Sequence, residues 1–218
     1  MIAGITHHLT DDLLMGYAAG VLPEAFDLVV ATHVSLCDDC RARLSAFEAL
    51  GGSVMEAGDA AEMSDGSLNA TLRLIAGGPK DAIRTEHRPR RAGPFPAPLA
   101  DYVGGGPDAV RWRPVGMGVK QAILRTTRDA TVRLLHIPAG AALPDHGHRG
   151  LELTLVLQGA FRDAEDRFGV GDVEIADQAT EHTPVAEAGD VCICLAATDA
   201  RLKFSGLIPR LAQPFFRI

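Results

Sequence analysis

The sequence predicts an α+β protein of two domains, with a small helical bundle followed by a β-barrel of the jelly-roll type. Apolar residues recur at helical spacing over the first 76 residues. Residues 77–107 are rich in Pro, Gly and Arg, and short strand-like runs separated by turns follow from residue 110. We therefore expect a helical domain over residues 1–85, a linker over 86–106 and a barrel over 107–218.

Four helices are expected in the first domain. In TDDLLMGYAAG, Thr10 is a candidate N-cap and acidic residues occupy the first turn. Pro23 suits the first helical position of PEAFDLVVATHVSLC. The run DDCRARLSAFEAL continues as a third helix, and SLNATLRLIAGG is a short fourth helix with Ser67 as its N-cap and Gly77 as its stop.

Five strands are expected in the second domain. They are GVKQAILR, TVRLLHI, LELTLVLQG, DVCICLA and RLKFSGL, and the turns PAGAALP, GVGD and EAGD separate several of them. Short strands with turns at this spacing are typical of a small barrel or a double-sheet jelly roll.

Composition and charge exclude several classes of protein. No apolar run approaches the ~18 residues that span a bilayer, and MIAGITHHLTDD lacks the pattern of a signal peptide. Four cysteines in 218 residues are too few for a secreted disulfide scaffold. Residues 1–76 hold eleven acidic and three basic residues, a net charge of −8, which disfavours direct binding to nucleic acid. Such a surface suits a basic protein partner or is simply solvated, and we expect a cytoplasmic protein without membrane contact.

The stretch HVSLCDDC indicates a metal site. On a helix, His33, Cys37 and Cys40 share one face because they are four and three residues apart. A structural zinc site normally has four ligands, so a fourth is expected from elsewhere. The pair His7 and His8, just before the first helix, can supply it, and spacing alone does not separate the two.

Two other interpretations of HVSLCDDC compete with zinc. A redox dithiol of this spacing usually follows a strand in a βαβ unit, which is absent, and Asp38 and Asp39 would raise the pKa values of the thiols. The second alternative is a solvated helix end with incidental cysteines. The spacing favours zinc over both.

A second cluster follows in GAALPDHGHRGLELTLVLQG. His146 and His148 alternate, so on one strand they face the same side, and Glu152 follows. His182 lies further on, after a Gly-Asp turn. Three imidazoles and one carboxylate suit Zn, Mn, Fe, Ni or Cu and leave coordination positions open. The alternative is a set of polar loop histidines without metal, which the full pattern G-x5-H-x-H-x3-E-x6-G disfavours.

Cys192 and Cys194 lie two apart on one expected strand. They could form a redox pair, but residues at this spacing on a flat strand are poorly placed for a disulfide. We expect them to pack as small core residues.

The two clusters together resemble the ChrR-type anti-sigma factors, over nearly the whole chain. The N-terminal part is similar to the zinc-binding anti-sigma domain, whose pattern is an early His followed by H-x3-C-x2-C, and HHLTDDLLMGYAAGVLPEAFDLVVATHVSLCDDCRAR is itself characteristic. The resemblance selects His8 over His7. The C-terminal part is similar to a cupin. One departure is Ala186, where the usual second cupin motif has Asn. The ligand sets that the resemblance implies are His8, His33, Cys37 and Cys40 in the helical domain, and His146, His148, Glu152 and His182 in the cupin.

The resemblance also implies a function. Zinc would staple the small helical bundle, and zinc or another divalent metal such as Mn or Fe would occupy the cupin. The chain would be a regulator, not an enzyme: it would bind an extracytoplasmic-function sigma factor in a 1:1 complex and release it under singlet oxygen or related oxidants. The expected sigma contacts are Leu13, Leu14, Tyr17, Leu68, Leu72 and Ile75. The alternative is a cupin metalloenzyme, a dioxygenase or isomerase, with an appended zinc domain.

Overall fold

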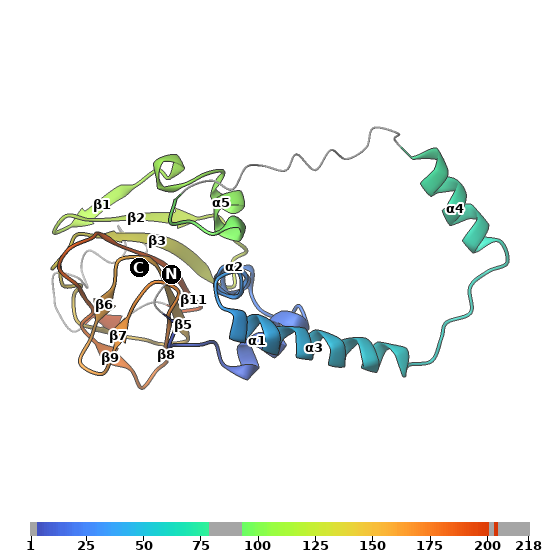
Figure 1. Ribbon diagram of the computed structural model, residues 1–218, viewed down its shortest axis with the longest axis horizontal. Helices are drawn as coiled ribbons and strands as arrows, with labels where there is room; N and C mark the ends of the chain where they lie inside the picture. The colour runs from blue at the N-terminus through green and yellow to red at the C-terminus, as the bar shows by residue number, and fades with distance from the viewer. Residues whose placement is uncertain (1–3, 79–92, 201–202, 205–218) are drawn as a thin grey trace.

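The computed structural model describes residues 4–78, 93–200 and 203–204 and confirms the α+β architecture, with helices beside an antiparallel barrel (Figure 1). The N-terminal helices are α1 (Asp11–Ala18), α2 (Glu24–Val34), α3 (Asp38–Glu56) and α4 (Ser67–Gly77). Among the described residues, no helix is both long and apolar enough to cross a membrane.

The helix starts follow from local capping. Thr10 caps α1, because its side chain accepts a hydrogen bond from the Leu13 amide. Pro23 precedes α2 as its N-cap instead of occupying the first helical position. The Sγ atom of Cys37 caps α3 by accepting from the Cys40 amide. Gly66, in the left-handed region, is the N-cap of α4 in place of the expected Ser67.

The barrel is built from antiparallel strands in three sheets. The strands are β1 (Arg113–Gly116), β2 (Val119–Leu124), β3 (Thr131–Ile137), β4 (His146–Gly147), β5 (Glu152–Gln158), β6 (Phe161–Arg162), β7 (Arg167–Phe168), β8 (Val173–Ala176), β9 (Glu181–His182), β10 (Val185–Ala186), β11 (Cys192–Thr198) and β12 (Lys203–Phe204). The large sheet has the order β1-β2-β3-β11-β5-β8, and the small sheets are β10-β6-β7 and β12-β4-β9. Four of the five expected strands form β2, β3, β5 and β11, and most of RLKFSGL lies outside the described residues.

Both faces of the large sheet are buried at its central strands β11 and β5. On β11, Ile193, Leu195 and Ala197 join the hydrophobic cluster that includes the helices, whereas Cys192 and Cys194 join a second cluster inside the barrel. This alternation is the period of two expected of a strand. One face of the sheet therefore packs against the helices, and the other face lines the barrel interior.

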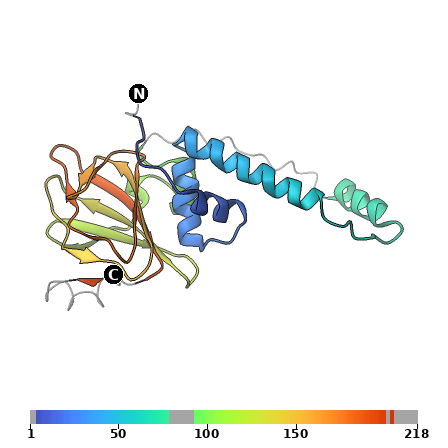
Figure 2. The ribbon, with the colours of Figure 1, turned by 90° about the horizontal axis from the view of Figure 1, so that it is seen from below.

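The helices rest on the outer face of this sheet. Helix α2 contacts β11, β5 and β3, and Figure 2 shows α2 lying against the barrel while α3 extends away from it. Helix α5 (Ala97–Val103) lies within the segment expected to be a linker and packs against α2, and its residues Leu99 and Ala100 are buried in the shared core. Helices and sheet thus share one continuous core, and the exact domain bounds stay a prediction.

Helix α4 is the exception to this packing. It lies beyond the end of α3, away from the barrel, in both views (Figures 1 and 2). The structure describes all of its residues, and none is buried. By contrast, Leu13 and Leu14, which were expected to contact a partner, are 7% and 0% exposed in the shared core. That part of the expected contact surface is wrong, because α1 packs against α2 and α3 and both side chains are buried in the shared core.

Candidate metal centres

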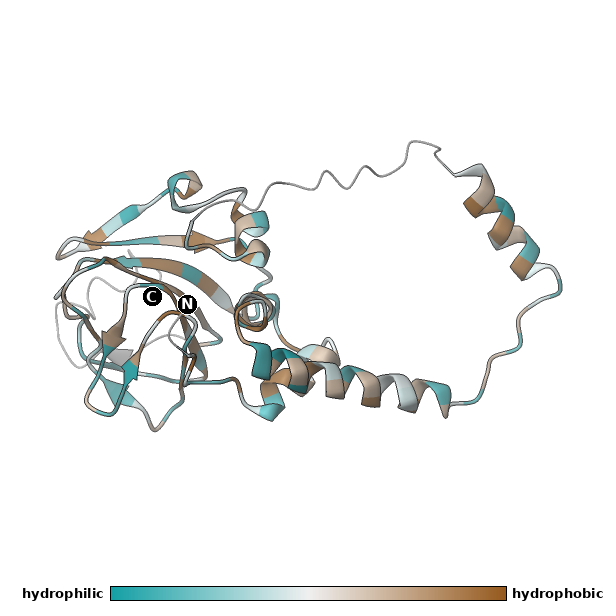
Figure 3. Ribbon diagram, in the orientation of Figure 1, coloured by the Kyte–Doolittle hydropathy of each residue, from teal (hydrophilic) through white to brown (hydrophobic). Residues whose placement is uncertain are grey.

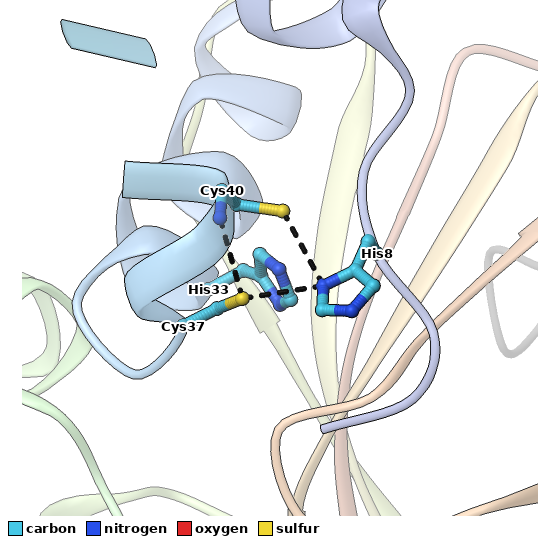
Figure 4. A group of neighbouring side chains, drawn as sticks. All are labelled: His8, His33, Cys37 and Cys40. Carbon is cyan, nitrogen blue, oxygen red and sulfur yellow. Dashed lines mark hydrogen bonds between the residues drawn. The ribbon is translucent and has the colours of Figure 1, made fainter. Parts of the chain in front are cut away.

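The first cluster, which we call the helical centre, consists of His8, His33, Cys37 and Cys40. One potential ligand atom from each lies within 4.8 Å of those of the other three. His8 comes from the segment before α1, His33 from the last turn of α2, and the cysteines from the start of α3. In Figure 4 the His8 ring points at both sulfur atoms, with Nδ1 3.3 Å from Cys37 Sγ and 3.7 Å from Cys40 Sγ.

These distances fit a tetrahedral metal ion. With Zn–S of about 2.3 Å and Zn–N of about 2.0–2.1 Å, a tetrahedral site places a nitrogen and a sulfur ligand about 3.5 Å apart. The two observed N···S separations lie on either side of that value. The donor set, two thiols and two imidazoles, is also typical of structural zinc.

The environment of His33 prepares it as a ligand. Its Nδ1–H donates to the carbonyl of Gly171 at 2.9 Å, and its buried Nε2 has no hydrogen-bond partner among the described residues. Burial lowers the pKa of His33 to about 4, so the ring is neutral at physiological pH. A neutral imidazole with an unpaired lone pair in a thiol cluster is what a metal ion requires.

The Cys40 thiol does not have the character of a reactive group. Burial, followed by the neighbouring Cys37, raises the pKa of Cys40 to about 11. The expected rise therefore has a different principal cause from Asp38 and Asp39. A thiol with a raised pKa is a poor nucleophile, which disfavours the redox-dithiol interpretation.

The structure separates the two candidate histidines before α1. His7 turns away from the helical centre: its Nε2 lies 2.9 Å from Asp166 Oδ2, and its ring packs on Phe168 with centroids 4.4 Å apart. His8, one residue later, faces the sulfurs. Alternation along the extended segment sends the two rings to opposite sides.

The second cluster, which we call the barrel triad, consists of His146, His148 and His182. His146 on β4 and His182 on β9 are direct cross-strand partners, which brings their side chains together. The Nε2 atom of His182 lies 3.1 Å from that of His146 and 3.3 Å from that of His148. All three side chains are buried.

The geometry of the barrel triad also fits a metal ion. His146 Nδ1–H donates to the Pro144 carbonyl at 2.8 Å, so its Nε2 carries a lone pair directed at the other rings. Lone pairs that converge in this way need a cation between them, either a proton or a metal. Two nitrogens bound to one metal at about 2.1 Å lie about 3.0–3.4 Å apart, as observed here.

Glu152, the fourth expected ligand, lies beside the triad. Its Oε2 is 3.9 Å from Nδ1 of His148, an atom without a hydrogen-bond partner among the described residues. Burial raises the pKa of Glu152 to about 7, although nearby Arg133 opposes the shift. Its role as a ligand stays a prediction.

Two carboxylates at this site were not predicted from the sequence. Glu174 Oε1 lies 2.7 Å from His182 Nδ1, and Asp163 Oδ2 lies 3.5 Å from the same atom. Burial alone would lower the pKa of His182, but the Glu174 carboxylate raises it above its ordinary value. A clue was present in the sequence: Glu174 interrupts the otherwise apolar strand VEIA eight residues before His182.

Three further positions of the barrel interior carry apolar or thiol groups. Cys192 and Cys194 are buried as expected, with their sulfurs 3.5 Å apart, and all four cysteines of the chain are free. Ala186, which replaces the usual cupin Asn, is buried in the same inner cluster. No polar side chain can therefore approach the triad from position 186.

An antiparallel barrel with an inward histidine triad, joined to helices that gather two thiols and two imidazoles, defines a cupin-type protein with a helical module and two clusters able to hold a metal ion. Comparison with known proteins makes the class specific. The family model of the ChrR cupin-like domain matches residues 103–201. The protein named anti-sigma-E factor ChrR, from Cereibacter sphaeroides, is 61% identical over 215 residues, which are 98% of this chain and 99% of the relative. The chain belongs to the ChrR family of anti-sigma factors.

A solved structure agrees with this assignment. The crystal structure of Rhodobacter sphaeroides SigE in complex with the anti-sigma ChrR contains a chain that is 60% identical, with a TM-score of 0.78. The match covers 89% of this chain and 99% of that one. The relative's name is that of a regulator, in agreement with the expectation that this chain is not an enzyme.

Proposed function

We propose that this chain is a cytoplasmic anti-sigma factor that binds an extracytoplasmic-function sigma factor in a 1:1 complex and releases it in response to an oxidative signal such as singlet oxygen. The observation that carries the proposal is the 61% identity, over 98% of the chain, to a protein named anti-sigma-E factor. The match to a chain from a complex with SigE supports the same partner class. Sigma factors act on RNA polymerase in the cytoplasm, which supports that location.

Helix α4 and the distal half of α3 offer the binding surface. Leu68, Leu72 and Ile75 recur at helical spacing on one face of α4 and are 70%, 52% and 72% exposed. Figure 3 shows apolar residues along α4 and α3, and the large hydrophobic side chains exposed on α3 are Leu50, Val54 and Met55. A contiguous apolar stripe of this kind is typical of a helix that docks into a partner's groove.

The charge of the helical region supports a protein partner over nucleic acid. Residues 1–76 carry a net charge of −8, which repels phosphates and attracts a basic surface. Sigma factors must themselves approach DNA, so they present basic surfaces that such a region complements. Of the six contacts expected from the sequence, the three on α4 stay part of the proposal.

We assign different roles to the two centres. Zinc in the helical centre, held by His8, His33, Cys37 and Cys40, would fix the N-terminal segment and the α2–α3 junction. Zinc or another divalent metal such as Mn or Fe would occupy the barrel, held by His146, His148, His182 and Glu152. Residues 1–85 would carry the sigma contact and residues 107–218 the sensing function.

The test is complex formation between the purified full chain and a candidate sigma factor from the same organism. We expect a 1:1 complex on size-exclusion chromatography, and Leu72→Asp to weaken it at least about 30-fold, as for a hot-spot residue worth about 2 kcal/mol. Ala70→Asp, on the opposite face of α4, is the matched control and should bind like wild type. If no such sigma factor binds the wild-type chain, the proposed function is wrong.

If the complex forms but Leu72→Asp binds as tightly as wild type, α4 is not the contact surface. The function then stands and the surface must be sought elsewhere, first on the exposed apolar residues of distal α3.

A further inference from the structure

One short segment touches both candidate metal centres. This bridging segment, Gly171–Glu174, runs into β8. At its start, the Gly171 carbonyl accepts from Nδ1–H of His33 in the helical centre at 2.9 Å. At its end, the Glu174 carboxylate lies 2.7 Å from Nδ1 of His182 in the barrel triad. Three residues of extended chain span about 10 Å, so the segment is a direct link between the centres.

The bridging segment also fixes the residues that precede His8. Asp172 Oδ1 accepts hydrogen bonds from the amides of Thr6 at 2.7 Å and His7 at 2.9 Å. The Val173 amide donates to the carbonyl of His7 at 3.3 Å. Two of the four donors of the helical centre, His33 and His8, are therefore positioned by groups of the barrel.

Close packing makes this contact specific. Gly171 has a φ of +93°, and a Cβ atom there would lie 2.6 Å from Cδ1 of Ile5 in the N-terminal segment. Only glycine satisfies both the conformation and the space. Backbone bonds between Val156 of β5 and residues 171 and 172 hold the segment to the large sheet.

On the barrel side, Glu174 acts as a positioning residue. It is 7% exposed, and its carboxylate accepts Nδ1–H of His182, which leaves Nε2 of that ring directed at His146 and His148. A buried carboxylate behind a histidine ligand fixes the tautomer and the ring orientation, and its removal typically lowers metal affinity about 10–100-fold.

We propose that the bridging segment couples the two centres, so that metal occupancy of the barrel triad raises the metal affinity of the helical centre. With metal bound at Nε2 and Glu174 bound at Nδ1, the His182 ring is fixed at both nitrogens, and it in turn holds the Glu174 carboxylate in place. Glu174 is part of the bridging segment, so this also fixes Gly171, which orients His33, and Asp172, which holds the segment before His8. By thermodynamic linkage the effect is reciprocal. The inference rests on the proposed function, in which an event in the barrel must reach the helices, and it supplies a physical route for it.

The experiment measures the cobalt affinity of the helical centre in the full chain. Co²⁺ bound by thiolates gives a charge-transfer absorption that imidazole and carboxylate ligands do not give, so this band reports the helical centre alone. We expect His146→Ala, which removes a donor of the barrel triad only, to weaken cobalt binding at the helical centre at least about fivefold, the lower end of usual coupling. Glu174→Gln, which keeps the size of the side chain, should act in the same direction, and Glu181→Gln is the matched control on an exposed carboxylate beside His182.

The route is tested by Asp172→Ala, which releases the segment before His8. In that background, His146→Ala should have little further effect on the cobalt band. Equal cobalt affinity in wild type, His146→Ala and Glu174→Gln, with native circular dichroism, would overturn the coupling. Sigma binding by the same preparations separates the two ideas, because intact sigma binding with equal cobalt affinities removes the coupling and leaves the proposed function standing.

Discussion

The helical centre and the barrel triad use similar residues in different ways. The helical centre brings four donors, two of them thiols, within 4.8 Å of one another from three separate pieces of the chain. The barrel triad brings together three imidazoles, and the nearest carboxylate of the expected set, Glu152, lies 3.9 Å from one ring. A closed set of four is typical of a structural site, whereas three close donors leave positions for a small ligand.

The surroundings of the two centres differ in the same sense. Of the nineteen residues of α3, only Cys40 and Leu44 are buried, so little apolar packing holds this helix to the other helices and the barrel. The barrel triad instead lies among strands that are held by backbone ladders and by a core of their own. The comparison teaches that loss of the first centre should unfold the helical region, whereas loss of the second should leave the fold intact.

The largest expected effect is that of Cys40→Ala. In small zinc folds the metal contributes about 10–16 kcal/mol of folding free energy, and part of this is lost with a thiolate ligand. We expect the variant to bind one metal ion per chain in place of two, to lose the helical signal of the N-terminal region on mild heating, and to lose inhibition of sigma-dependent transcription in vitro.

Cys192→Ala is the matched control for this prediction, because it removes a buried cysteine outside both centres. It should keep two metals and full inhibition. Full inhibition by a reduced Cys40→Ala variant would contradict the structural role of the helical centre.

The next effect concerns release of the partner. We expect His146→Ala to keep sigma binding at saturating zinc, because none of the proposed contacts on α4 lies near the barrel, but to blunt release under oxidant. A ligand shifts an equilibrium only through its different affinity for the two states, and conversion of a mostly bound into a mostly free population needs about 5.5 kcal/mol. Reversible binding of a weak ligand rarely supplies this, so covalent oxidation or proteolysis is expected to complete the release.

The measurement is a sigma-dependent reporter in cells exposed to singlet oxygen. Wild type, His146→Ala and Glu152→Ala are compared at equal protein levels. Normal induction in both variants would show that the barrel triad is not the sensor.

The fold class was predictable because apolar residues recur clearly at the helical period in the first part of the sequence and at the strand period in the second. The 3.6-residue pattern gave α2 and α3, and the alternating pattern gave β3, β5 and β11 close to their observed bounds. What the sequence could not predict is which element each apolar face packs against. Leu13 and Leu14 looked free for a partner because a local pattern does not show which elements α1 packs against. In the structure α1 lies against α2 and α3, and both side chains join the shared core. For the same reason α5 was assigned to a linker, although it packs against α2.

The sites show the same limit. Spacing identified His33, Cys37 and Cys40, since three positions within eight residues are a local property. The expectation that they share one helix face was wrong: His33 lies in the last turn of α2, and Cys37 is the extended N-cap of α3. The groups that orient the rings are not local: Gly171 lies 138 residues from His33 in the chain, and Glu174 belongs to a different strand from His182. Such contacts follow from the fold and leave no motif.

The smallest expected effect separates His7 from His8 and sharpens the definition of the helical centre. The His7 ring contacts Asp166, whose side chain is 59% exposed, and an exposed pair of this kind contributes about 0–1 kcal/mol. His7→Ala keeps the backbone amide that Asp172 binds, so the path of the chain into His8 is preserved. We therefore expect two metals per chain, intact sigma binding and a melting temperature within about 2–4 °C of wild type.

His8→Ala, one residue further on, removes the nitrogen that faces both sulfurs and should lose the metal of the helical centre. Metal analysis and thermal melts of the two variants side by side decide the matter, and loss of metal in His7→Ala with retention in His8→Ala would reverse the assignment.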